Sequence, residues 1–219
     1  MSKSKVDIKV EVCNPMEETC IAMILITRLL TENKIDMELT IAYDFDTEVD
    51  NRAGFYLPGA EGLANTIFVN PLVCKTKQDV IDGTVETLFC QGYVADFSVF
   101  GVTIHEFCHL LHFEVFKDMV DEYAEAFPLD RLYLNEYCGH ILPDELAEIM
   151  TLYISNPYLL KMISKEHWQF CKRYFKSPVA CSPKKARQIY QAFPVSVKEE
   201  LKEKWGIVFN EHEQKFVKV

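Results

Sequence analysis

The sequence predicts an α+β fold, in which a small mixed or antiparallel sheet is combined with helices and followed by a mostly helical C-terminal part. Three observations support this class. Segments that alternate between apolar and polar residues, as strands do, lie mainly before Pro71. Segments with apolar residues three and four positions apart, typical of helices, dominate from about Asp79 onward. Finally, 49% hydrophobic and 12% aromatic residues in a chain of 219 are enough for a substantial core.

The first half of the chain is expected to alternate between strands, helices and turns. The acidic turn over 44–52 lacks the glycine and the terminal glutamate of a calcium-binding EF-hand loop, so we interpret it as a solvated loop. The last two strands are close enough in sequence to form a hairpin. The expected strands cover 6–12, 37–43, 54–59 and 65–71, and the expected helices cover 15–32, ending at Asn33, and 79–90.

The second half is expected to be helical with short interruptions. Pro143 suits the first turn of a helix over 144–154. This helix should end before Asn156-Pro157, because a residue that precedes proline avoids the helical conformation. The further expected elements are a polar helix or loop over 118–127, a loop over 177–183 and a terminal hairpin over 207–219.

A His-Glu-x-x-His motif, formed by His105, Glu106 and His109, lies in a stretch with helical spacing. Residues four apart on a helix share one face and are separated by about 6 Å along the axis, so both imidazoles can reach one metal ion. Glu106 then points to the neighbouring side of that ion, where a bound water would be deprotonated. The motif therefore predicts a zinc site with hydrolytic chemistry.

The apolar residues of this helix strengthen the metal interpretation. They leave His105, His109 and His112 together on an adjacent stripe, which packing alone does not explain. We interpret His112 as a residue of the site wall rather than as a ligand. Asp96 or Ser98 is expected to cap the start of the helix. The apolar stripe consists of Ile104, Phe107, Cys108, Leu111 and Val115.

A third metal ligand must come from another element, because a catalytic zinc generally takes three protein ligands and a water. Asp144 and Glu148 are four apart on the next predicted helix and therefore share a face. One carboxylate can bind the metal while the other holds a ligand histidine in the required tautomer. Glu145, His140 and Glu148 itself are the alternative donors in this part of the chain.

With both helices considered, the chain resembles the gluzincin class of zinc metallopeptidases, which includes thermolysin-like and lethal-factor-like catalytic domains. In lethal-factor-like domains the second helix reads Glu-x-x-Ala-Glu, and a catalytic Tyr lies seven residues before its first Glu. Here residues 144–148 read Asp-Glu-Leu-Ala-Glu and match the acidic and alanine positions, with a shorter Asp in place of the first Glu. Tyr137 lies seven residues before Asp144.

The resemblance implies a zincin-like fold, with an active-site helix and a second metal-ligand helix, over about 54–160. It implies Zn²⁺ as the cofactor, with His105, His109 and Asp144 as its ligands. Glu148 is implied as the carboxylate that supports a ligand histidine. We accordingly expect a single domain over 1–219, made of this metal core and a helical C-terminal lobe over about 161–219, since no repeat or linker divides the chain.

The activity implied by the resemblance is that of a zinc-dependent endopeptidase. Glu106 would act as the general base, and Tyr137 would donate a hydrogen bond to the developing oxyanion. The segment 65–71 would be the edge strand that pairs with an extended protein or peptide substrate. The implied partner is therefore a polypeptide.

Composition and charge argue against several other functions. A formal net charge of −10 and a pI near 5.1 give no electrostatic support for nucleic-acid binding. The longest apolar run, over 21–30, is far shorter than the roughly 20 residues of a membrane span. The start of the chain lacks the apolar core of a signal peptide, so we expect a cytoplasmic protein that does not associate with membranes.

Two rival functions have weaker support in the residues. A zincin-fold binding or regulatory module would keep the metal for structure, but it would not require Glu106. A non-peptidase zinc amidohydrolase with Cys90 as third ligand would leave the acids of the second helix unexplained. The eight cysteines are expected to be reduced thiols. Cys108 and Cys138 each lie near a histidine in sequence, but neighbours on a helix point in different directions.

Overall fold

The computed structural model describes the parts of the chain that build the predicted metal core and C-terminal lobe. Several predictions fall on other residues: the acidic turn over 44–52, the helix over 79–90, the caps Asp96 and Ser98, and the side chains of Cys90, Tyr137, Cys138 and His140. The described residues are 7–11, 17–43, 53–56, 58, 65–70, 74, 99–129, 131–132, 134, 141–192, 195–213 and 215–219.

The N-terminal strands form a four-stranded mixed sheet in the order β1-β2-β4-β3. Strands β1 (Asp7–Glu11), β2 (Glu38–Tyr43) and β4 (Thr66–Val69) are parallel, and β3 (Gly54–Tyr56) pairs antiparallel with β4. The predicted α+β class is confirmed, and so is the predicted antiparallel pairing of the segments that form β3 and β4.

The prediction that segment 65–71 is the edge strand is wrong. Strand β4 has β2 on one side and β3 on the other, so its backbone groups are used on both sides. Both strands are short and mostly apolar, and neither shows a strict alternation, so their sequences alone did not indicate which of them lies at the edge. The edge position on this side of the described sheet belongs to β3.

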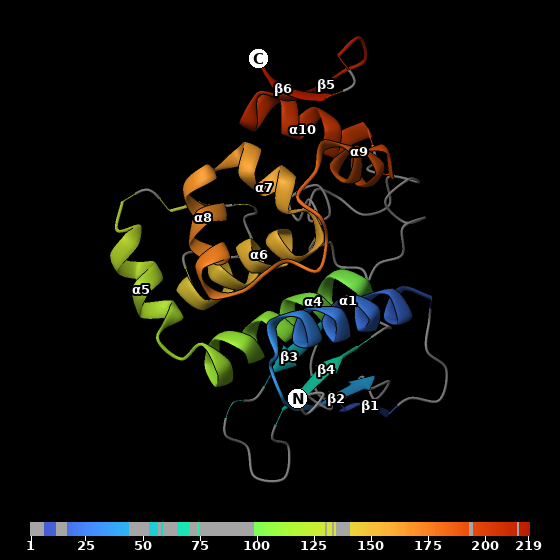
Figure 1. The fold of residues 1–219 in the computed structure, drawn as a ribbon, viewed down its shortest axis with the longest axis vertical. Helices are drawn as coiled ribbons and strands as arrows, with labels where there is room; N and C mark the ends of the chain where they lie inside the picture. Colours follow the sequence, from blue (N-terminus) through green and yellow to red (C-terminus); the bar gives the residue numbers. More distant parts are fainter. Residues whose placement is uncertain are drawn as a thin grey trace.

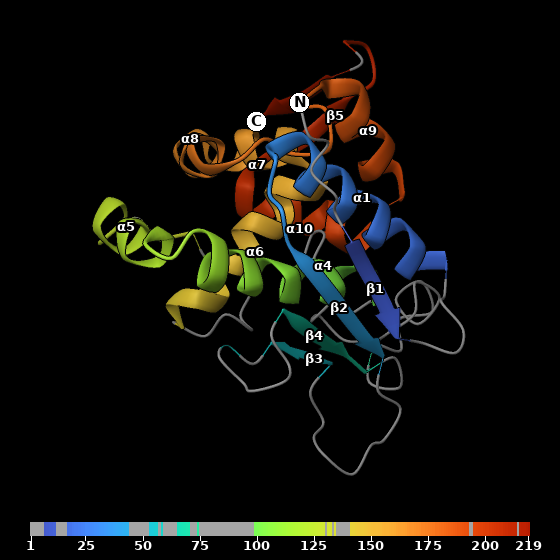
Figure 2. The same ribbon diagram turned by 60° about the horizontal axis from the view of Figure 1, so that its bottom comes forward.

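Helices α1 (Glu17–Asn33) and α4 (Val99–Leu110) lie together over one face of this sheet, as Figures 1 and 2 show. α4 is buried around nearly its whole circumference, which explains why its sequence is apolar on more than one side. The predicted apolar stripe is confirmed for Ile104, Phe107, Cys108 and Leu111, each with no exposed surface.

Helix α6 (Leu142–Ser155) packs on α4 on the side opposite the sheet (Figure 1). Pro143 occupies its first turn and the helix ends at Ser155, so both predicted boundaries are confirmed. Asn156 then caps α7 (Pro157–Ile163), its side chain accepting a hydrogen bond from Leu159 N at 3.2 Å. α4 is therefore held between the sheet and α6, the arrangement that places its histidines opposite the acids of α6.

The last part of the chain forms helices and the predicted terminal hairpin, at the end of the molecule furthest from the sheet (Figure 1). The polar segment predicted as a helix or loop over 118–127 is a helix. Here the C-terminal lobe denotes residues 161–219, whose hairpin is held by aromatic packing such as Tyr190 against Phe216, with ring centroids 4.9 Å apart. The helix of that polar segment, α5 (Met119–Ala126), precedes α6 and lies outside the lobe. The elements of the lobe include α8 (Lys165–Tyr174), α9 (Pro183–Ala192), α10 (Val195–Trp205), β5 (Ile207–Asn210) and β6 (Lys215–Lys218).

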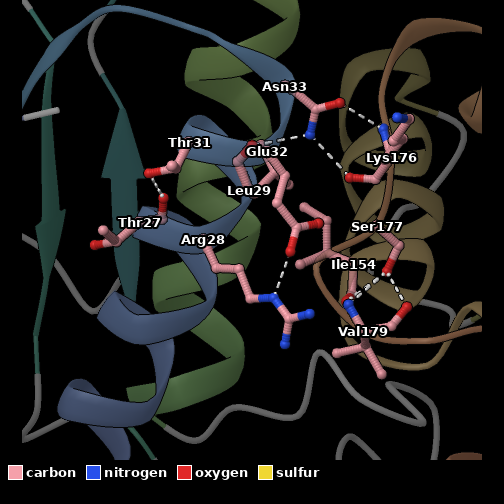
Figure 3. Close-up of polar contacts among 10 residues, drawn as sticks. All are labelled: Thr27, Arg28, Leu29, Thr31, Glu32, Asn33, Ile154, Lys176, Ser177 and Val179. Carbon is pink, nitrogen blue, oxygen red and sulfur yellow. Dashed lines mark hydrogen bonds and ion pairs between the residues drawn. The ribbon is translucent and has the colours of Figure 1, made fainter. Parts of the chain in front are cut away.

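Asn33, the predicted end of α1, also ties α1 to the segment of the lobe that follows α8 (Figure 3). Its Nδ2 donates to Lys176 O at 2.9 Å and to Leu29 O at 2.8 Å, and its Oδ1 accepts from Lys176 N at 2.7 Å. Ser177, next in the chain, donates to Ile154 O of α6 at 3.1 Å. The segment after α8 is thus fastened to both α1 and α6.

None of the helices in the described part of the chain is long and apolar enough to cross a membrane.

Candidate metal centre

The three predicted ligands meet between α4 and α6. His105 Nε2 lies 3.0 Å from His109 Nε2, and Asp144 Oδ1 lies 3.1 Å from His109 Nε2 and 3.9 Å from His105 Nε2. One ligand atom from each residue falls within 4.8 Å of the other two. Two imidazole nitrogens and a carboxylate oxygen are a donor set that suits zinc and other divalent transition metals. This group could hold a metal ion.

Carboxylates surround His105 on more than one side. Its Nε2 faces the ligand cluster, and its Nδ1 lies 2.9 Å from Glu148 Oε1. Burial alone lowers the pKa of His105, but the neighbouring carboxylates of Asp144 and Glu148 outweigh it and raise that pKa to about 10. Burial raises the pKa of Asp144, yet its two histidine partners hold it below the ordinary value. The centre is thus a negatively charged pocket that favours a positive charge between these side chains.

The second motif histidine has a different kind of neighbour. His109 Nδ1 lies 3.0 Å from His112 Nε2, with the two rings tilted by 72°. His112 is only 1% exposed, so it lies buried beside His109. Burial first, and then the neighbouring His109, lower the pKa of His112 to about 3, so its ring is neutral. Burial also lowers the pKa of His109.

The helix changes form where His112 lies. After Leu110, residues Leu111–Val115 form a π-helical turn, η1, in which Phe116 N donates to Leu111 O at 2.8 Å. Such wide turns are rare and are found preferentially near functional sites.

Glu106 lies on α4 beside the edge strand. It is 7% exposed, and a Cβ added to Gly54 of β3 would lie 2.9 Å from Glu106 Cγ and 2.5 Å from Val102 Cγ1. Only glycine allows the edge strand to approach α4 this closely. The strand backbone is thereby brought next to the predicted general base.

Glu145, one of the alternative ligands, is committed to another interaction. It has no exposed surface, and it accepts a hydrogen bond from Tyr123 Oη and one from Arg131 Nε at 2.7 Å, with Arg131 Nη2 at 2.6 Å. As a neighbour of Asp144 on a helix it points in a different direction. Glu145 is therefore a buried structural acid. Glu148 as a ligand is disfavoured because its carboxylate lies beside the outer nitrogen of His105.

Sequence reasoning overlooked Gly54 and the contact between His112 and His109. For His112 the available signal was its spacing of three from His109, which predicts contact on a helix. For Gly54 no sequence signal existed, since a close approach between distant segments becomes visible only in three dimensions.

No protein-family model matches the chain, and no curated protein or solved structure matches it either. What the site can do must therefore be inferred from its own geometry and chemistry.

Proposed function

We propose that this protein is a zinc-dependent endopeptidase with a zincin-like active site. The observation that carries the proposal is the convergence of His105 and His109 of α4 with Asp144 of α6, whose ligand atoms lie within 4.8 Å of one another. Glu106 is on the same helix as the two histidines. Zinc bound there would supply Lewis acidity, which lowers the pKa of a water and polarises a carbonyl. The alternatives to Asp144 are weakened by the positions of Glu145 and Glu148.

Glu106 is the proposed general base. Its carboxylate accepts a proton from the attacking water and then delivers it to the leaving amine. Glu106 is largely buried, which favours this role because a site that excludes bulk water limits the loss of the transferred proton to solvent. Glu148 supports the ligand His105 through Nδ1, which leaves Nε2 free to bind metal. Tyr137 remains the proposed donor to the oxyanion.

Strand β3 is the proposed place for the substrate backbone. On one side it pairs with β4, and within the described sheet no strand lies on its other side. An extended peptide added there would run alongside Gly54, the residue that lies against Glu106. The same contact that excludes a Cβ at residue 54 thus brings a bound peptide close to the general base.

Metal content and peptide cleavage test this proposal together. We expect about one zinc per chain in the wild type and in Glu106→Gln, and loss of zinc in His105→Ala and Asp144→Ala, by mass spectrometry of the purified proteins. Cleavage of a peptide library should fall about 10²–10⁴-fold in Glu106→Gln, because the general base is lost. Full activity in Glu106→Gln, or no zinc in the wild type after reconstitution, would contradict the proposal.

A further inference from the structure

His109 has hydrogen-bonding neighbours at both of its ring nitrogens. Nε2 faces the ligand cluster, 3.0 Å from His105 Nε2 and 3.1 Å from Asp144 Oδ1. Nδ1, on the other side of the ring, lies 3.0 Å from His112 Nε2. At that distance the two nitrogens share a proton in a hydrogen bond, so one ring must donate and the other accept.

We propose that His112 is a positioning residue for the metal centre: its Nε2 accepts a hydrogen bond from His109 Nδ1–H. This bond fixes His109 as the tautomer whose Nε2 carries a lone pair toward Asp144 and His105, and it holds the plane of the ring. The inference rests on the proposed metal site, to which it adds the residue that orients the second histidine ligand.

The two ligand histidines are thus supported by different chemistry. His105 Nδ1 lies 2.9 Å from a carboxylate oxygen of Glu148, whereas His109 Nδ1 lies against a neutral imidazole. A carboxylate strengthens the basicity of the ring it supports, and a neutral acceptor does so less. Their supports also come from different elements, Glu148 from α6 and His112 from the turn after α4. His112 therefore orients His109 without adding a further negative charge to the pocket.

A purely structural role explains the surroundings of His112 poorly. If Nε2 accepts from His109, the proton of His112 must reside on Nδ1. That nitrogen is buried and has no hydrogen-bond partner among the described residues. A buried N–H without a partner costs stability, so an apolar side chain of similar size would serve packing better. The hydrogen-bond acceptor that His112 offers to His109 explains why a histidine occupies this position.

Substitutions of His112 can distinguish a role in positioning His109 from a role in packing alone. His112→Leu removes the partnerless N–H of His112 but leaves Nδ1–H of His109 without its acceptor, so these two effects oppose each other and the metal-free protein should melt close to the wild-type temperature. Its zinc affinity should nevertheless fall about 10–100-fold, the loss typical when the hydrogen-bond partner of a ligand histidine is removed. His112→Gln, whose Oε1 can take the place of the imidazole Nε2, should recover most of the affinity.

The measurement is zinc affinity by competition with a chelator, together with the visible spectrum of the Co²⁺ form, which reports ligand geometry. The control is His167→Leu, which removes another buried histidine, 4% exposed and located on α8 of the lobe. It should leave both readouts at wild-type values. Should His112→Leu fail to fold, His112→Asn replaces it, since the shorter amide does not reach the Nε2 position and should bind zinc more weakly than His112→Gln.

The outcomes distinguish this inference from the proposed function. Wild-type affinity and spectrum in His112→Leu would overturn the inference while leaving the metal site intact, as would equal weakening in His112→Gln and His112→Asn. A loss as complete as in His109→Ala, with no recovery in His112→Gln, would make His112 a ligand and also overturn it. No zinc or Co²⁺ binding in the wild type would overturn the proposed metal site and this inference with it.

Discussion

The α4–α6 layer and the C-terminal lobe differ in the kinds of side chain that they bury. Within the described residues, the three buried glutamates all belong to α4 and α6: Glu106, Glu145 and Glu148. In the described part of the lobe, His167 is the one buried polar or charged residue, and aromatic rings such as Phe216 fill the interior. One region buries ionisable groups and the other buries rings.

The two regions also differ in charge. Residues 1–160 contain 10 Lys and Arg against 27 Asp and Glu, whereas residues 161–219 contain 13 against 6. Their formal charges are therefore −17 and +7, consistent with the net value of −10 for the whole chain. Burying a carboxylate is costly unless it is paired, so a fold that needed only stability would not concentrate carboxylates between two helices. The α4–α6 layer therefore combines an excess of acidic residues with buried carboxylates, and it also holds the candidate metal centre.

Among the substitutions considered, we expect the removal of Arg131 to cause the largest loss of stability, because it affects a buried carboxylate of the α4–α6 layer. Arg131→Ala leaves the fully buried Glu145 without its cationic partner, so we expect the free energy of unfolding to fall by about 3–5 kcal/mol. Urea denaturation in the presence of a chelator measures the change without a contribution from metal. Replacing both partners, Arg131→Leu with Glu145→Leu, should recover much of the loss; a double variant as unstable as Arg131→Ala would contradict this account.

A cavity in the lobe should reduce stability without affecting the metal site. Phe216 is 4% exposed and packs against Tyr190 and Phe209, so Phe216→Ala should lower the free energy of unfolding by about 3 kcal/mol. Zinc affinity, measured well below the melting temperature, should stay at the wild-type value. A parallel fall in zinc affinity would mean that the two regions are coupled.

The pH dependence of zinc affinity should reflect the loss of one proton, that of His105. Between about pH 7 and about pH 9 His105 is protonated, because its carboxylate partners raise its pKa to about 10 despite burial, whereas His109, whose pKa is lowered from its ordinary value, is neutral. Zinc must displace this proton, so its apparent affinity should rise about tenfold per pH unit. Chelator competition across this range measures the slope. A slope near zero or near two would contradict this assignment.

The raised pKa of His105 also affects the stability of the metal-free protein, which should fall as the pH rises, whereas zinc affinity should increase. A pKa raised from 6.5 to about 10 on folding stabilises the folded state fully below pH 6.5, and this stabilisation is lost as the pH rises toward 10. Metal-free wild type should therefore become less stable between about pH 7 and about pH 9 in urea denaturation. His105→Gln, which has no proton to lose, should show a flatter profile over this range.

Weakening the connection between α1 and the lobe should have the smallest effect. Asn33→Ala removes two hydrogen bonds to Lys176, both at exposed sites, so we expect a loss of about 1–2 kcal/mol. Hydrogen exchange of the amide of Lys176 would report the loss locally. Arg28→Ala is the control, because its ion pair with Glu32 is exposed and lies within α1, so it should change stability by less than about 0.5 kcal/mol.

The helices and strands were largely predictable because their signals are local. The stripe through Ile104 and Leu111, the proline at position 143 and the Asn156-Pro157 pair each reflect spacing or backbone restriction within one element. The edge strand was not predictable in this way. Strands β3 and β4 are both short and mostly apolar, and which of them lies at the edge depends on the pairing of β4 with β2.

For the metal centre, the sequence alone determined the chemistry that α4 can offer, because the spacing of His105, Glu106 and His109 on a helix dictates which side chains share a face. Only the tertiary structure decided the rest. It placed Asp144 beside His109, Glu148 beside His105 and Glu145 beside Arg131, three acids that look equivalent in sequence. The physical reason is that a helix periodicity specifies directions around one axis, whereas the partner in each direction depends on how the second helix packs against it.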